Sequence, residues 1–400
     1  MGDPFSLIAN WLTDLLVGFG LDLELTKILL KFLGAAVMGT VAMALMLFTI
    51  WLERKIVARI QDRLGPNRVG PYGIFQTVAD LLKLLTKEVL VPSGADRFIF
   101  VIAPMLVVMS VVGLWAVLPF APTLFGTDVN VGVLYVVSIG SIGTLGIMMA
   151  GLSSNNKFAL LGAFRTVAMM LSYAVPMILA LLIPTMLAGS MGLVDIVEAQ
   201  SSIWFVILAP VAALIFFVSS IAEVGRAPFD LLEADSEIVA GFHIEYSGLS
   251  FGMFFVAEFM HAFTISALTA TLFFGGWQGP WAETYPILGF FYFLIKTSMV
   301  YFVVIWFRGT FPRIRIDQLN SLNWKFLVPL GLASVVFTAI IDKLAVEQDF
   351  SRVLFHWGGN ALLVLLTFIG LRMYARSARE QKAAMKAELP GSSQVVGSGD

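Results

Sequence analysis

The sequence has no cysteine and only three histidines in 400 residues. Without thiolates, the chain can form no disulfide, no iron–sulfur cluster and no thiolate zinc site. The histidines are His243, His261 and His356, which stand in three separate segments, so neither a bis-histidine haem nor a His-rich metal centre is expected. If the protein takes part in redox chemistry, the electrons must therefore travel in a partner chain.

Charged residues are also scarce, at 13%, whereas hydrophobic residues make up 58% of the chain. Soluble domains are typically about 25% charged and about 45–50% apolar. The composition therefore indicates a polytopic membrane protein, and the net charge of −2 gives no indication of nucleic-acid binding. The N-terminal residues "MGDPFSLIANWLTDLLVGFG" lack the basic start and small-residue site of a cleaved signal peptide. Asp14 and Asp22 interrupt their apolar run, which predicts an interfacial helix rather than a span.

Apolar runs long enough to cross a bilayer, which takes roughly 20 residues, recur along the chain. The sequence predicts an all-α membrane bundle of about nine transmembrane helices, with amphipathic interfacial helices. The expected spans are Phe32–Leu52, Phe98–Pro119, Val131–Leu152, Thr166–Ala188, Ile203–Ala222, Phe251–Gly275, Ile287–Phe307, Leu322–Ile341 and Val353–Leu371.

Lysine and arginine are unevenly distributed between these spans. Connections two, four and six carry none, whereas the first carries eight: Arg54, Lys55, Arg59, Arg63, Arg68, Lys83, Lys87 and Arg97. By the positive-inside rule the first connection is cytoplasmic. The prediction is a multi-pass protein of the plasma or inner membrane, with its N-terminus outside and its C-terminus in the cytoplasm. The expected parts are an external segment (1–27), a core of eight spans (28–345), a ninth span (346–376) and a disordered cytoplasmic tail (377–400).

The first connection contains strong helix breakers, at Gly65-Pro66-Asn67 and at Gly70-Pro71. Beyond them, apolar residues from Ile74 to Leu85 follow helical spacing, which predicts a helix lying at the membrane surface. Its lysines are typical of an anchor for anionic lipids. Asp80 and the rigid turns are not needed for such an anchor and favour a docking surface or the rim of a pocket.

The connection Ala222–Gly248 holds six carboxylates and only one firm cation, Arg226. Asp230 and Glu233 have the spacing of a capping box, so part of this acidity is explained by a solvated helix start. Glu223 directly follows an apolar span, where an ionisable group is a functional hypothesis. Arg226, three residues later, is a plausible partner for it.

Three ionisable groups also stand inside predicted spans. Glu258 and His261 are three residues apart, and therefore on one helix face, and Lys296 lies in the next span. Two interpretations stay open: Glu258 pairs with Lys296, or these groups continue a chain of proton sites that begins with Glu53 and the acidic connection.

Several long segments resemble the signature segments of one family, the H subunits of NADH-quinone oxidoreductase, which is respiratory complex I. These segments are "ERKIVARIQDRLGPNRVGPYG", "ADLLKLLTKE", "SSNNKFALLGAFRTVAMMLSY", "AEVGRAPFDLLEADSEIVAGFHIEYSG" and "RGTFPRIRIDQLNSLNWK". The resemblance runs from about Lys31 to Ile341, in the right order.

The resemblance implies a membrane subunit of a proton-translocating enzyme, at the junction with the peripheral arm. Quinone would be the substrate at the subunit interface, and NADH, FMN and the iron–sulfur clusters would belong to partner subunits. Those partners would include peripheral-arm subunits and neighbouring membrane-arm subunits. No metal site and no catalytic residue is expected in this chain. The resemblance carries over, as quinone-cavity candidates, Arg54, Arg63, Asp80, Arg226, Phe229 and Asp230. As proton-path candidates it carries over Glu53, Glu223, Glu233, Asp235, Glu237, Glu245, Glu258 and Lys296.

Ala174 departs from the family, which usually has an acid in this position of "SYAVP". Another acid, such as Glu223 or Glu258, or a water chain would then complete the proton route. Two alternative functions remain. One is the homologous subunit of an energy-converting hydrogenase or a related ferredoxin-driven complex, and the other is a stand-alone ion antiporter. The ninth span and the tail lie beyond the common core of the family, and no role is assigned to them.

Overall fold

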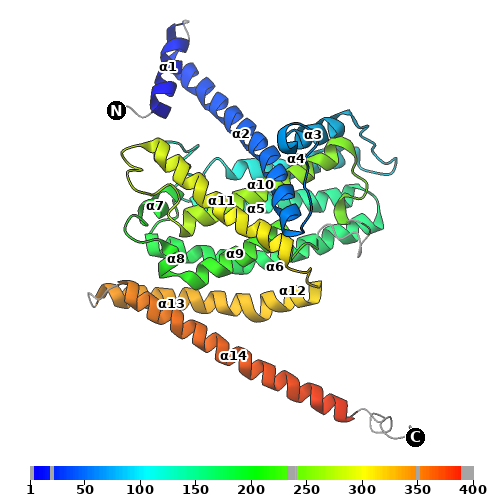
Figure 1. The fold of residues 1–400 in the computed structure, drawn as a ribbon, viewed down its shortest axis with the longest axis vertical. Helices are drawn as coiled ribbons and strands as arrows, with labels where there is room; N and C mark the ends of the chain where they lie inside the picture. Colours follow the sequence, from blue (N-terminus) through cyan, green and yellow to red (C-terminus); the bar gives the residue numbers. More distant parts are fainter. Residues whose placement is uncertain (1–3, 19–21, 232–238, 240, 348–351, 389–400) are drawn as a thin grey trace. The chain divides into compact units, whose positions relative to one another are not determined.

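The computed structural model describes residues 4–18, 22–231, 239, 241–347 and 352–388. In this part of the chain, all regular structure is helical, as the sequence predicts (Figure 1). The helices are α1 (Pro4–Gly18), α2 (Leu23–Ile60), η1 (Pro71–Gly73), α3 (Gln76–Thr86), α4 (Arg97–Leu114), α5 (Gly132–Ser153), α6 (Lys157–Ala188), α7 (Leu193–Glu198), α8 (Phe205–Leu208), α9 (Pro210–Val224), η2 (Gly241–His243), α10 (Gly248–Phe273), α11 (Pro286–Thr310), α12 (Ile316–Leu322), η3 (Asn323–Leu327), α13 (Val328–Glu347) and α14 (Arg352–Glu388).

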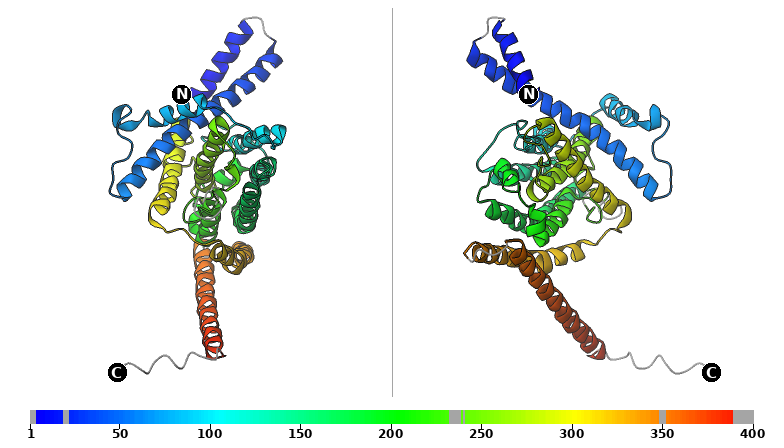
Figure 2. Two further views of the ribbon diagram at one scale, coloured as in Figure 1. Left: turned by 90° about the vertical axis from the view of Figure 1, so that its right-hand side faces the viewer. Right: turned by 60° about the vertical axis from the view of Figure 1, so that its left-hand side comes forward.

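The chain divides into two compact units, residues 1–335 and 336–400. The first unit is built around α10, which packs against α2, α4, α9 and α11 (Figures 1 and 2). In the most apolar stretch of α10, 67% of the residues are buried, compared with 33% in α5 and in α11. A helix that is buried on all sides occupies the centre of a bundle, so side chains of α10 can meet residues from several helices.

Eight described helices are long and apolar enough to cross a membrane, and they match eight of the nine predicted spans. The segment predicted as the fifth span, Ile203–Ala222, is different. It is interrupted at Ala209 (φ −134°, ψ 62°), because Pro210 has no N–H to continue the helix and instead begins α9. With 15 residues, α9 is roughly 22 Å long, less than the ~30 Å hydrocarbon layer.

Gln200 satisfies backbone groups at the ends of the neighbouring helices α7, α8 and α10. Its side-chain amide donates to the carbonyls of Ile196 (3.1 Å) and Thr271 (2.9 Å), and its Oε1 accepts from the N–H groups of Phe205 (3.2 Å) and Gly275 (2.9 Å). The side chain is completely buried. Irregular backbone at membrane depth is tolerated where such groups replace water as partners.

The breakers in the first connection act as predicted. Helix α2 ends at Ile60, a short turn forms at Pro71–Gly73, and α3 follows. Gly70 and Gly73 have φ values of 74° and 76°, a conformation that glycine adopts most readily. Val78, Leu82 and Leu85 are exposed along α3, which leaves one apolar face of this helix open, as expected of a surface helix.

The second unit contains α14 and the end of α13. His356 is fully buried, and its Nε2 lies 3.2 Å from Oδ1 of Asp342. Helix α14 continues to Glu388, into the segment 377–400 for which the sequence predicts a disordered tail. The residues from Ala375 to Glu388 are rich in Ala, Arg, Lys, Glu and Gln, which have high helix propensity and favour this extension. The other boundaries predicted between the four parts of the chain stay a prediction.

Candidate functional site

A tight turn after α9 brings Arg226 into the interior of the first unit. Gly225 ends α9 with a left-handed conformation (φ 74°), and the Arg226 carbonyl accepts a hydrogen bond from the N–H of Phe229 (2.9 Å). The peptide bond between Ala227 and Pro228 is cis. The turn places Arg226 and Phe229 in the interior, with exposed fractions of 2% and 5%.

Arg226 joins two carboxylates from different helices. Its Nη1 donates to Oε1 of Glu53 on α2 (2.9 Å), and its Nε lies 3.2 Å from Oε1 of Glu258 on α10. Its guanidinium carbon lies 4.0 Å from the ring centre of Phe259. Buried charges are retained in proteins when they are paired in this way.

This arrangement corrects the predicted pairing of Arg226 with Glu223. That prediction assumed a continuous helix, in which residues three apart are neighbours. The left-handed Gly225 turns the chain away from the helix path, so Arg226 reaches Glu53 and Glu258 instead.

Two residues of α11 complete the cluster, and neither is among the candidates that the sequence indicates. Arg308 donates to Oε1 of Glu53, and the Tyr301 hydroxyl donates to Oε2 of Glu53 (3.2 Å). Tyr301 and Arg308 are seven residues apart, two helical turns, so they lie on the same face. The sequence pattern that could have identified these two residues is a tyrosine and an arginine at this spacing near the end of a span. We name Glu53, Arg226, Glu258, Tyr301 and Arg308 the ion cluster.

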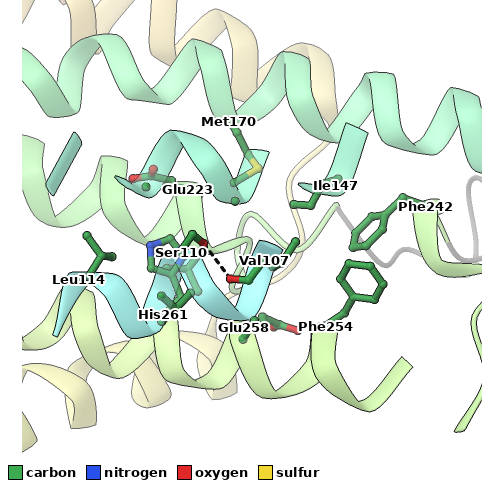
Figure 3. Close-up of a pocket in the computed structure, with 15 residues that line it drawn as sticks. Val107, Ser110, Leu114, Ile147, Met170, Glu223, Phe242, Phe254, Glu258 and His261 are labelled. Carbon is green, nitrogen blue, oxygen red and sulfur yellow. Dashed lines mark hydrogen bonds between the residues drawn. The ribbon is translucent and has the colours of Figure 1, made fainter. Parts of the chain in front are cut away.

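A cavity lies next to the ion cluster, between α4, α5, α6, α9 and α10 (Figure 3). Glu223, Glu258 and His261 line it, together with Ser110 and mostly apolar side chains such as Val107 and Ile147. The cavity volume is about 60 Å³. A single water needs roughly 10–15 Å³ when volume is counted over the positions open to its centre. Glu258 belongs both to the cavity and to the ion cluster, so the two are continuous.

The Glu223 carboxylate makes no hydrogen bond or ion pair with any residue that the structure describes. It lines the cavity from α9, while Glu258 lines it from α10. A carboxylate with space for water beside it can take up or release a proton without breaking a contact to another side chain of the described chain.

Arg54 and Asp80 form a separate pair near the protein surface. Nη1 of Arg54 lies 2.6 Å from Oδ2 of Asp80, and the two side chains are 38% and 36% exposed. Gln76 also donates to Asp80, at 3.3 Å. The contact ties the end of α2 to α3. It presents polar groups at the surface of this chain.

Arg63 and Asp230 are also accessible. Arg63 is exposed and donates through Nε to Gln61 (2.7 Å). Asp230 lies 3.2 Å from Nη2 of Arg313. Phe229, by contrast, packs in a core with Tyr173, Ile221 and other apolar residues. Of the six quinone-cavity candidates, Arg54, Arg63, Asp80 and Asp230 therefore have surface available, whereas Arg226 and Phe229 are interior.

Glu245 and Lys296 lie apart from the ion cluster. Glu245 accepts a hydrogen bond from Asn156 (2.7 Å) and lines a different pocket at the start of α6. Lys296 donates to the carbonyls of Phe274 (2.8 Å) and Gln278 (2.7 Å), and its Nζ lies 4.6 Å from the ring centre of Trp204.

The suggested pairing of Glu258 with Lys296 is therefore wrong. Lys296 binds backbone carbonyls next to the end of α10, while Glu258 pairs with Arg226. Glu233, Asp235 and Glu237 lie outside the described residues, and so does the predicted capping box. Within the described ranges, no group of three or more His, Cys, Asp or Glu side chains could hold a metal ion.

Known proteins match the part of the chain that holds the ion cluster and the cavity. The sequence model of the NADH dehydrogenase family covers residues 33–339. The NADH-quinone oxidoreductase H subunit of Dehalococcoides mccartyi strain CBDB1 is 46% identical over 336 residues, 84% of this chain and 93% of that protein. This chain belongs to the H-subunit family of NADH-quinone oxidoreductase. The H subunit of Carboxydothermus hydrogenoformans is 48% identical over 305 residues, 76% of this chain and 87% of the relative. The H subunit of Geobacillus kaustophilus is 46% identical over 310 residues, 77% and 92% of the two chains.

Membership of the H-subunit family makes this protein a membrane subunit of the NADH-quinone oxidoreductase complex, with other subunits of that complex as partners. The matched residues 33–339 include the whole ion cluster and the cavity. They end before α14, which begins at Arg352.

Proposed function

We propose that this protein completes a quinone-binding cavity at a subunit interface and couples quinone reduction to proton translocation. The single observation that supports the proposal best is the position of Glu258. Its carboxylate faces Arg226 on one side and lines the internal cavity on the other. A change of charge near the ion cluster would therefore alter proton affinity inside the cavity.

The accessible residues near α3 support the quinone-binding part of the proposal. Arg54, Asp80 and Arg63 offer hydrogen-bond donors and acceptors where a quinone headgroup and a partner subunit would meet. Electrons reach the quinone from a partner subunit, and this chain supplies the wall and the adjacent charges. Reduction places negative charge on the quinone, which attracts the arginines and draws protons toward it.

The coupling step follows from the shared ion pairs. Arg226 is shared by Glu53 and Glu258, so stronger attraction toward one carboxylate weakens its contact with the other. A Glu258 carboxylate that loses part of its positive partner binds a proton more tightly. Glu258 and Glu223 then exchange protons through water in the cavity.

The orientation of the chain in the membrane belongs to the same proposal. The Lys and Arg bias favours a cytoplasmic position for the first connection, and with it α3, with the N-terminus outside. The relatives reported above all carry the name of the quinone oxidoreductase subunit, which favours this function over a ferredoxin-driven complex or a stand-alone antiporter.

The substitution Glu258→Gln in the assembled complex tests the proposal. We expect NADH:quinone turnover coupled to proton uptake to fall by about tenfold or more, because the amide cannot carry a proton. Glu24→Gln is the matched control, since Glu24 has a 74% exposed side chain on α2 and should behave as wild type.

Electron transfer from NADH to an artificial acceptor that bypasses quinone reports whether each variant complex is assembled. If Glu258→Gln is assembled and retains both turnover and proton translocation, the proposal is wrong. Loss of both in assembled Glu258→Gln complex, with the control unaffected, supports it.

A further inference from the structure

His261 is the third ionisable side chain among the described residues that line the cavity, and it has no role in the coupling step proposed above. It follows Glu258 by three residues on α10, so both side chains lie on one face of the helix, about one turn apart. Figure 3 shows His261 lining the same cavity as Glu258 and Glu223. The described lining of the cavity thus contains two carboxylates and one imidazole.

The other described residues that line the cavity cannot hold a proton near neutral pH. The lining residues from α4, α5 and α6 are apolar or glycine, apart from Ser110. The Ser110 hydroxyl donates to the Val107 carbonyl (2.7 Å), so its oxygen is available only to accept. Among the described residues, the titratable groups that face His261 at the cavity are therefore Glu223 on α9 and Glu258 on its own helix.

The ring of His261 makes no hydrogen bond with any side chain or backbone group in the described part of the chain. A structural histidine in an apolar bundle normally has a fixed partner for at least one nitrogen, because an unpaired polar group is costly there. The cavity supplies the space for that partner, since its 60 Å³ is enough for a few water molecules.

We propose that His261 is a proton-carrying residue of this protein, which exchanges protons with Glu223 and Glu258 through water in the cavity. The proposal rests on the proposed function of the cavity and extends it one helical turn along α10. Imidazole is suited to this step because it can bind a proton at one ring nitrogen and release another from the second.

The transfer conserves atoms and charge. A protonated carboxyl, on Glu223 or Glu258, gives its proton to an adjacent water, which passes one of its own protons to the free nitrogen of His261. The carboxyl O–H bond breaks and a ring N–H bond forms, which leaves a carboxylate and an imidazolium. The second ring N–H then releases its proton to the next water, and the ring returns to its neutral form as the other tautomer.

The variant His261→Gln in the assembled complex removes the proton-carrying group and keeps a polar side chain. We expect at least about a tenfold loss of coupled NADH:quinone turnover, and fewer protons translocated per NADH in proteoliposomes. His356→Gln is the matched control: the same change at a buried histidine outside the cavity. It should keep the wild-type ratio of protons to NADH.

A second variant, His261→Ala, separates proton transfer from packing. Added imidazole can occupy the space left by the side chain, and we expect it to restore proton translocation in His261→Ala but to have no effect on Glu258→Gln. Electron transfer from NADH to an artificial acceptor confirms that each complex is assembled. If His261→Gln is not assembled, the response of His261→Ala to imidazole decides.

The outcomes distinguish the two proposals. Wild-type turnover and stoichiometry in His261→Gln, with loss of both in Glu258→Gln, would overturn the role of His261 and leave the proposed function intact. Wild-type behaviour of both variants would overturn both. Failure of imidazole to restore assembled His261→Ala would also count against proton transfer and indicate a packing role.

Discussion

Glu53 and Arg54 are neighbours in the sequence and end up in opposite environments. Glu53 is 4% exposed and binds Arg226, Arg308 and Tyr301. The Arg54 side chain is 38% exposed and, among the described residues, pairs with Asp80, which also accepts a hydrogen bond from Gln76 at the start of α3. Successive residues of a helix point about 100° apart, so one step along α2 moves from the interior to the surface.

This difference in burial decides how much each ion pair contributes to stability. Removing one partner of a buried ion pair leaves an uncompensated charge and costs about 3–5 kcal/mol, whereas an exposed pair is worth about 0–1 kcal/mol. The ion cluster is therefore strongly coupled to the fold. The surface pair can exchange its partner for a ligand at little cost to stability.

The largest expected effect is that of Arg226→Met. The substitution leaves Glu258 without its arginine and Glu53 with one arginine fewer, so we expect destabilisation by about 3–5 kcal/mol. The amount of assembled complex in membranes and its thermal unfolding temperature measure this. Arg313→Met, which affects a 39% exposed side chain, is the control, and equal losses for both variants would contradict the distinction.

A smaller effect is expected for Tyr301→Phe, which removes only the hydroxyl that donates to Glu53. A hydrogen bond to a charged group contributes about 1.5–3 kcal/mol, and both arginines remain. The thermal unfolding temperature should fall between those of wild type and Arg226→Met. Tyr285→Phe, at a 50% exposed tyrosine, should have no effect. A wild-type unfolding temperature for Tyr301→Phe would show that the hydroxyl does not support the cluster.

The smallest effect on stability is expected for Asp80→Asn. The lost pair with Arg54 is exposed, so the change in unfolding free energy should stay below about 1 kcal/mol and should shrink further at high salt. Under the proposed function the apparent affinity for quinone should decrease at the same time. Steady-state kinetics over a range of quinone concentrations measure this. A large loss of stability in Asp80→Asn, with an unchanged affinity for quinone, would contradict the quinone-binding role given to the Arg54–Asp80 pair.

Most of the fold can be predicted because apolar runs and glycine–proline breakers act locally. Gly70 and Pro71 interrupt the first connection where the sequence indicates, and eight spans match long helices. The interruption at Ala209 is not predicted because Pro210 stands inside an apolar run, where hydropathy does not separate a helix start from a helix interior.

Contacts within the site are harder to predict. The sequence indicates Glu53 and Arg226 as candidates, but their contact joins residues 173 positions apart and depends on how α2, α9 and α10 pack. Arg308 is not indicated because it resembles the other basic residues that follow a span. The partner of Lys296 cannot be predicted either, since backbone carbonyls carry no signature in the sequence.

Under the proposed function, Gln200 has a consequence for proton leakage through the bundle. Helices α7 and α10 end and helix α8 begins around Gln200, and helix ends leave N–H and carbonyl groups that attract water. Under the proposed function, water that reached these groups would open a route by which translocated protons return across the membrane. By binding four of these groups with one buried amide, Gln200 takes the place of that water.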